Sequence, residues 1–159
     1  IKEQYQLLNG ERIPTLKEVL SLIDEKVGMV IEIKPDAKRK NYRQIAEKVE
    51  EELSNIKDTR NFILISFYPQ PLLYLKHLNI VRCLLVGKDN PSTYVLRNFF
   101  EGVDLDIELL KEEKYQKSIS KRLTMSWTID NQEKAKLALA TSDILTFQFL
   151  PLSSVKKGA

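Results

Sequence analysis

The sequence predicts an α/β protein in which helices cover a parallel sheet. Short, mostly apolar segments alternate with helical patterns at a spacing of roughly twenty residues, which is typical of right-handed βαβ units. The 159 residues are 43% hydrophobic and 30% charged, which is ordinary globular composition and enough to bury one core. We therefore expect a single domain over residues 1–150 and an aperiodic, flexible tail over residues 151–159.

The first element is a helix expected over residues 13–28. Thr15 and Glu18 form a capping-box pair at its start, apolar residues recur at helical spacing, and Gly28 ends it. A β-rich segment over 29–34 follows directly and ends at Pro35. Further helices are expected at 42–53, 71–79, 92–101, 110–121 and 131–140, and further strands at 62–67, 80–87, 103–107, 123–129 and 143–149.

Six strands in this arrangement fit either a (β/α)₈ barrel or an open, doubly wound sheet. No glycine-rich phosphate loop follows any of the strands, which excludes the nucleotide-binding form of the open sheet. A closed eight-stranded barrel needs about 250 residues, so in a barrel these six units form an incomplete one.

Composition also restricts partners and location. Lys and Arg outnumber Asp and Glu by only 25 to 22 and the charges are interspersed, so a nucleic-acid partner is not expected. No stretch approaches the ~20 apolar residues of a transmembrane helix. The single cysteine, Cys83, lies in an apolar run and is expected to be a buried hydrophobe. The chain begins at Ile1, which indicates a fragment or a processed product; the cytoplasm is the first expectation, and secreted or membrane-tethered forms stay open.

Two charged residues share one face of the 29–34 segment. Side chains alternate along a strand, so Val30, Glu32 and Lys34 face one way, while the intervening apolar residues face the other. At the carboxyl end of a barrel strand, a carboxylate can hold a hard cation and an ammonium can neutralise a phosphate. The alternative is an internal Glu–Lys pair, or a strand end that reaches water.

Other candidates for chemistry carry weaker signals. Trp127, the only tryptophan, ends a strand and could wall a substrate pocket, although core packing is the simpler explanation; Ser66 is a weaker candidate of the same kind. Alternation also puts three carboxylates on one face, which could be read as a metal-binding row, although a solvated strand end or a helix N-terminus explains Glu108 without a metal ion. These are Asp104, Asp106 and Glu108. The only histidine, His77, falls in the back half of a helix and is expected on the surface, so a histidine-dependent mechanism cannot be assembled from this chain.

Four motifs, in this order, resemble the glycerophosphodiester phosphodiesterase family: IPTLKEVL from residue 13, EIKP from 32, SFYPQPLLYLK from 66 and SWTID from 126. The resemblance implies a variant (β/α)₈ TIM barrel, of which the six strands would be the third to the eighth. It also implies hydrolysis of glycerophosphodiesters to glycerol 3-phosphate and an alcohol, as part of lipid and glycerol metabolism, with a divalent cation (Mg²⁺ or Ca²⁺) and two histidines.

Carried over residue by residue, the resemblance makes Glu32 a metal ligand, directs Lys34 at the phosphate and puts Trp127 in the substrate pocket. The family's histidines belong to HRG and HD motifs upstream of the IPTL helix, so no catalytic residue is assigned in this chain. The sequence also departs from the family at the last strand, where Phe147 and Gln148 replace an acidic pair.

Three hypotheses follow from these observations. In the first, the chain is part of a metal-dependent glycerophosphodiester phosphodiesterase that is active as the complete protein. In the second, the chain is a non-catalytic barrel remnant that acts as a phosphate-ligand binding or interaction module. In the third, it belongs to a different phosphate-binding barrel enzyme. In each case six barrel strands leave two edges unpaired, which predicts self-association of the isolated chain.

Overall fold

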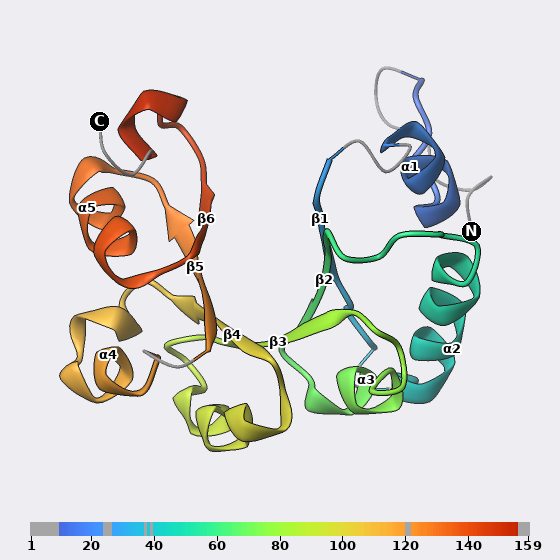
Figure 1. Ribbon diagram of the computed structural model, residues 1–159, viewed down its shortest axis with the longest axis horizontal. Coiled ribbons are helices and arrows are strands. Elements are labelled where there is room, and N and C mark those ends of the chain that lie inside the picture. Colours follow the sequence, from blue (N-terminus) through green and yellow to red (C-terminus); the bar gives the residue numbers. More distant parts are fainter. Residues whose placement is uncertain (1–9, 24–26, 37, 39, 120–121, 156–159) are drawn as a thin grey trace.

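The computed structural model describes residues 10–23, 27–36, 38, 40–119 and 122–155. Its centre is a six-stranded parallel sheet in which each strand pairs with the next along the chain. The strands are β1 (Met29–Glu32), β2 (Phe62–Ser66), β3 (Val81–Val86), β4 (Gly102–Asp106), β5 (Leu123–Ile129) and β6 (Ile144–Phe147). The sheet curls like a barrel wall, with β1 and β6 as its two edges in the described part of the chain (Figure 1). The predicted incomplete barrel is thus confirmed.

Helices cover the convex side of this wall (Figure 1). The α-helices are α1 (Leu16–Ile23), α2 (Tyr42–Leu53), α3 (Pro69–Tyr74), α4 (Glu113–Ile119) and α5 (Gln132–Thr141). Three 3₁₀ segments accompany them: η1 (Pro91–Phe99), η2 (Leu109–Lys111) and η3 (Leu152–Val155). The predicted capping box is confirmed, because the Thr15 N–H donates to the Glu18 carboxylate at 2.7 Å and the Glu18 N–H donates to the Thr15 hydroxyl at 3.3 Å.

Several predicted helices differ from the structure in type or bounds. The helix expected over 71–79 is α3, which begins at Pro69 and already ends at Tyr74. The segment expected as a helix over 92–101 is the 3₁₀ helix η1, which starts at Pro91. The Ser92 and Thr93 hydroxyls both donate to Asn90, and such local bonds compete with regular α-helical hydrogen bonding. The segment expected over 110–121 begins with η2, and α4 starts only at Glu113.

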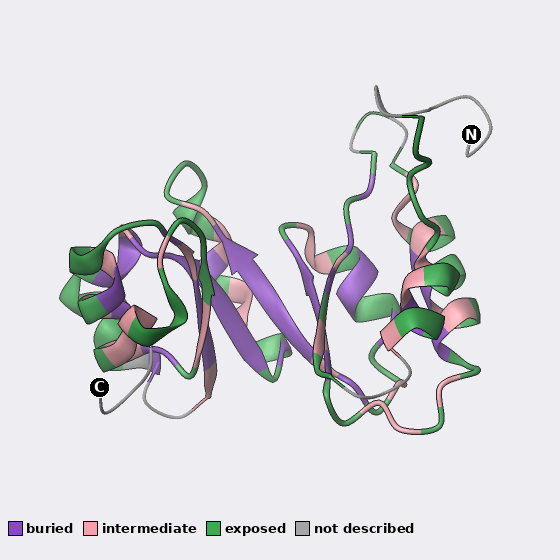
Figure 2. Ribbon diagram, turned by 90° about the horizontal axis from the view of Figure 1, so that it is seen from above, coloured by how far each residue is buried: buried purple, intermediate pink, exposed green. Residues whose placement is uncertain are grey.

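The two faces of the sheet carry separate apolar clusters. The outer cluster lies between the sheet and the helices and includes Ile31, Leu64 and Leu84. The inner cluster lies on the concave face and consists of four buried residues, with partly buried neighbours around them: Ile65, Cys83, Leu85 and Met125. The central strands β3 and β4 are almost wholly buried, whereas β1 and β6 are more exposed, and the helices expose their outer surfaces (Figure 2).

Gly102 is required where three strands approach each other on the inner face. It pairs with Cys83 on one side and Leu123 on the other. A Cβ at this position would lie 2.5 Å from the Cys83 Sγ and 2.7 Å from the Leu123 carbonyl oxygen, so any larger residue would displace the backbone.

The predicted tail over residues 151–159 is described in part. Residues 152–155 form η3, which packs against α5, and the Gln132 side-chain amide donates to the Ser154 hydroxyl at 2.8 Å. The rest of the predicted tail, 156–159, lies outside the described residues. None of the described helices combines the length and the apolarity that a membrane span needs.

Candidate functional site

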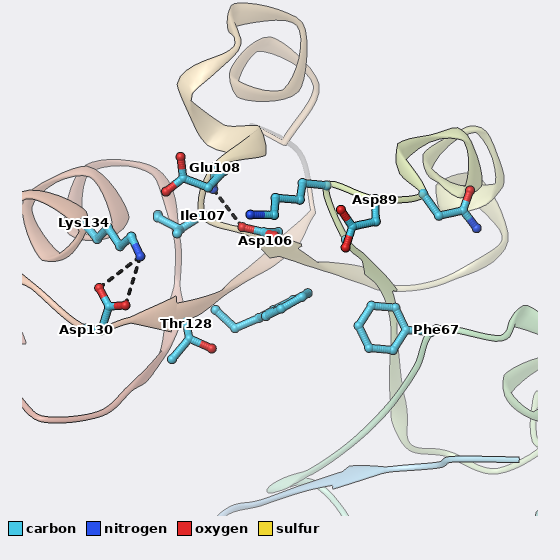
Figure 3. Close-up of a pocket in the computed structure, with 12 residues that line it drawn as sticks. Phe67, Asp89, Asp106, Ile107, Glu108, Thr128, Asp130 and Lys134 are labelled. Atoms are coloured by element: carbon cyan, nitrogen blue, oxygen red, sulfur yellow. Dashed lines mark hydrogen bonds and ion pairs between the residues drawn. The ribbon is translucent and has the colours of Figure 1, made fainter.

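A pocket of about 510 Å³ opens where β3, β4 and β5 end (Figure 3). In barrels of parallel strands this carboxyl-terminal rim carries the functional groups. The loop after β3 contributes Gly87–Asn90, the end of β4 contributes Asp106–Glu108, and Phe67 follows β2. The remaining lining residues belong to β5 and the start of α5: Trp127, Thr128, Asp130 and Lys134.

An aromatic pair forms one wall of the pocket. The rings of Phe67 and Trp127 stand nearly perpendicular, with 5.6 Å between their centroids and 89° between their planes. The indole N–H of Trp127 donates to the Asp104 carbonyl at 3.4 Å. Phe67 is 41% exposed. Trp127 therefore lines a pocket, as the sequence predicts; its contact with substrate stays a prediction.

Glu32 and Lys34 lie together at the end of β1. Val30 is 42% exposed whereas Ile31 and Ile33 are buried, which confirms the predicted alternation along this segment. The Lys34 ammonium lies 3.1 Å from the Glu32 carboxylate, and the lysine side chain is mostly exposed. Glu32 and Lys34 thus form an ion pair that is accessible at the barrel rim and is not internal. Their contacts with a metal ion and a phosphate stay predictions.

The row Asp104, Asp106 and Glu108 divides into two environments. Asp104 and Asp106 face the barrel interior and are 1% and 9% exposed. Glu108 follows the strand and pairs with Lys111 at 2.9 Å. Among the described residues no group of three or more His, Cys, Asp or Glu side chains is arranged to hold a metal ion.

Asp104 lies in an apolar environment. Its carboxyl group is buried, and its Oδ1 has no hydrogen-bond partner among the described residues. Burial raises the pKa of Asp104 to about 7, and the negative charge of Glu32 adds to the rise. The sequence signal for this burial is the position of Asp104 between Val103 and Leu105, in a strand that has another strand on each side.

Ser66 lies at the predicted end of its strand, but its hydroxyl serves the backbone. It is fully buried, donates to the Ile33 carbonyl at 2.7 Å and accepts the Tyr68 N–H at 3.1 Å. Both bonds hold the end of β1 against the start of α3, and Ser66 is not among the residues that line the pocket. Its contact with substrate stays a prediction.

His77 is on the surface, as predicted, but it follows α3 and does not lie in the back half of a helix. Its Nε2 lies 2.6 Å from a Glu50 carboxylate oxygen on α2, outside the barrel. Cys83 is buried in the inner cluster, as predicted, and burial raises the pKa of its thiol to about 12.

Phe147 ends β6 and is 37% exposed, and the adjacent Gln148 N–H donates to the Ile129 carbonyl at 2.9 Å.

This chain resembles known proteins in its structure. The sequence matches no protein-family model, and no curated protein matches it. A glycerophosphodiester phosphodiesterase from Parabacteroides distasonis superimposes with a TM-score of 0.78 and 21% identity, covering 96% of this chain and 67% of that one. The corresponding enzyme from Thermotoga maritima gives 0.64 and 20%, covering 87% of this chain and 61% of that one.

A phosphodiesterase from Oleispira antarctica, solved with the product sn-glycerol-3-phosphate, gives a TM-score of 0.69 and 20% identity. The match covers 87% of this chain and 58% of that one. The chain thus spans roughly three-fifths of the length of such enzymes. Its six parallel β/α units have the fold of the glycerophosphodiester phosphodiesterases, in the form of an incomplete barrel.

Proposed function

We propose that this chain forms most of the barrel of a glycerophosphodiester phosphodiesterase. In a protein whose barrel is complete, it would contribute to hydrolysis of glycerophosphodiesters to glycerol 3-phosphate and an alcohol. The observation that carries the proposal is the barrel wall itself, with a carboxylate–ammonium pair at the end of β1 and a pocket at the ends of the following strands. The glycerol phosphate bound to the Oleispira antarctica enzyme supports the same substrate class.

Three residues have distinct proposed roles in binding the substrate. Lys34 would bind a phosphate oxygen, because its exposed ammonium can leave Glu32 at little cost. Trp127 would exclude water from one side of the substrate and fix its position. Ser66 would act indirectly, because its bond to the Ile33 carbonyl sets the path of the backbone between Glu32 and Lys34.

Glu32 has the donor chemistry to hold Mg²⁺ or Ca²⁺, since both ions prefer carboxylate oxygens. Its side chain is 28% exposed and therefore accessible from the rim. A lone carboxylate holds such an ion poorly, so further ligands would come from beyond the described residues. When bound, a divalent cation neutralises charge that develops on the phosphoryl oxygens.

The test is release of glycerol 3-phosphate from a glycerophosphodiester by the natural protein at its full length. We expect wild-type activity, and a loss of at least about a hundredfold in Glu32→Gln, because a charge that stabilises the transition state is removed. Glu47→Gln is the matched control, since Glu47 is an exposed carboxylate on α2 that pairs with Arg43. Equal loss in both variants, or no activity at all in the wild type, would contradict the proposal.

A second candidate function is binding without catalysis. It is favoured by the position of the single histidine, because His77 lies on the outside of the barrel and cannot act as a proton donor at the rim. A natural full-length protein that binds glycerol 3-phosphate but does not hydrolyse glycerophosphodiesters would establish this alternative.

A further inference from the structure

Another cavity, which we call the outer groove, lies between α3 and η1 among the helices on the convex side of the wall (Figure 1). Its volume of about 540 Å³ falls within the range of about 300 to 1,000 Å³ that is typical of ligand sites. The described lining residues comprise two cations, no carboxylate, and the apolar residues Pro69, Leu73, Leu96, Phe99 and Phe100. Leu73 and Phe99 are 40% and 63% exposed, so the apolar wall of the groove is open to solvent.

Arg82, one of the two cations, lies at the buried side of the outer groove and is already neutralised. Its side chain is 8% exposed, and its Nη2 lies 2.6 Å from a Glu101 carboxylate oxygen. Its Nη1 donates to the Leu72 carbonyl at 3.0 Å, and its guanidinium carbon lies 6.0 Å from the centre of the Phe100 ring. The Arg82–Glu101 pair therefore adds little net charge to the groove.

Lys76, the second cation, puts a positive charge at one end of the outer groove. It is exposed, and within the described residues its ammonium has no salt-bridge partner. Lys76 also lines a neighbouring cavity of about 420 Å³ at the start of β3, together with the polar side chains of Thr59, Arg60 and Asn79. The apolar groove thus ends at a positive charge, beside a cavity lined by polar groups.

The outer groove matches a ligand that has one anionic end and one apolar chain. Its apolar wall can remove an alkyl chain from water, and Lys76 can pair with a carboxylate. A peptide fits less well, because the apolar side chains offer no partners for its backbone N–H and C=O groups. A segment paired with the edge strands would not cover the groove either, because α2 separates it from β1, and α4 and α5 separate it from β6.

We infer that the outer groove binds a free fatty acid, with the alkyl chain between α3 and η1 and the carboxylate at Lys76. The inference goes beyond the proposed function, because the outer groove shares no lining residue with the pocket at the ends of β3, β4 and β5. A fatty acid in the groove therefore binds without displacing a ligand at the barrel rim.

The experiment is calorimetric titration of the natural full-length protein with decanoate and with decyltrimethylammonium, each below its critical micelle concentration. The two probes carry alkyl chains of the same length and head groups of opposite charge. We expect decanoate to bind about tenfold more tightly than decyltrimethylammonium. Octanoate, whose chain is shorter, should bind about tenfold more weakly than decanoate, because it buries less apolar surface.

Two variants locate the bound probe. Lys76→Gln should weaken decanoate binding about three- to fivefold and reduce the difference between the two head groups. Phe99→Asp puts a carboxylate into the apolar wall and should weaken decanoate binding at least about tenfold. Both residues are exposed, so the variants should keep the wild-type Tm. Lys48→Gln is the matched control, since Lys48 is an exposed lysine on α2 outside both cavities.

Equal affinity for decanoate and decyltrimethylammonium, or unchanged decanoate binding in Phe99→Asp, would overturn the inference. Equal weakening in Lys76→Gln and Lys48→Gln would also contradict it, because the probe would then respond to net charge and not to Lys76. Titration in the presence of glycerol 3-phosphate separates the groove from the rim pocket. Unchanged decanoate affinity supports the outer groove, and displacement of decanoate would place the chain at the rim and refute the inference.

Discussion

The two faces of the sheet differ in how completely they are covered. Along β1 the neighbouring residues Val30 and Ile31 are 42% and 7% exposed, although both are apolar and both belong to the same strand. Ile31 packs against helices in the outer cluster, whereas Val30 faces the concave side, where the inner cluster is small. The outer layer therefore supplies most of the hydrophobic stabilisation, and the inner face carries the charged and aromatic groups of the candidate site.

The difference between the two faces is expected to have its largest effect on self-association of the chain. In the described part of the chain the sheet has two edges, at β1 and β6, and an inner face that no further strand covers. We expect it to form dimers or larger species, because unpaired strand edges and apolar surface favour association. Light scattering after size-exclusion chromatography tests this over a range of concentrations. A monomer that melts cooperatively would show that the inner face is complete as it stands.

The next effect concerns the buried carboxyl group on the inner face. The pKa of Asp104 is raised from 3.8 to about 7, so between these values the native state holds a proton that the unfolded chain has lost. Stability therefore falls as the pH rises from about 4 to about 7, by at most about 4 kcal/mol. Asp104→Asn removes the titrating group and should flatten this fall. Urea unfolding at pH 5 and pH 8, in buffer containing a metal chelator, measures it; parallel wild-type and variant profiles would contradict the account.

A smaller effect separates two adjacent leucines on β3. Leu84 is fully buried in the outer cluster, and Leu85 is 3% exposed in the inner cluster. We expect Leu84→Ala to lower the free energy of unfolding by about 3 kcal/mol and Leu85→Ala by about half as much, because the small inner cluster can collapse around the cavity. Chemical denaturation of the two variants provides the comparison. Equal losses would mean that both faces are packed alike.

The order of strands and helices was predictable from sequence because it depends on local patterns. The capping box at Thr15, the alternation along β1 and the repeated apolar strands are all encoded within a few residues of each other. Pairing of consecutive strands then follows from the short helical connections. The 3₁₀ form of η1 was not predicted, because it depends on hydrogen bonds of Ser92 and Thr93 that periodicity does not reveal.

The candidate site was predicted less completely, because burial depends on what covers a residue. The sequence indicated Trp127 and the Glu32–Lys34 pair, whose positions follow from strand alternation. It gave no indication that the Ser66 hydroxyl is used by the Ile33 and Tyr68 backbone. The pocket residues after β3 lie in a loop, where no periodicity indicates which side chains point inward.

The most direct test of the division between the two faces uses neighbouring residues at the end of β1 in the natural full-length protein. Glu32 belongs to the inner face and Ile33 is 2% exposed in the outer cluster. The measurement is glycerol 3-phosphate release together with Tm for Glu32→Gln and Ile33→Val. We expect Glu32→Gln to lose activity with little change in Tm, and Ile33→Val to keep activity while losing about 1 kcal/mol of stability. Full activity in Glu32→Gln would contradict the account.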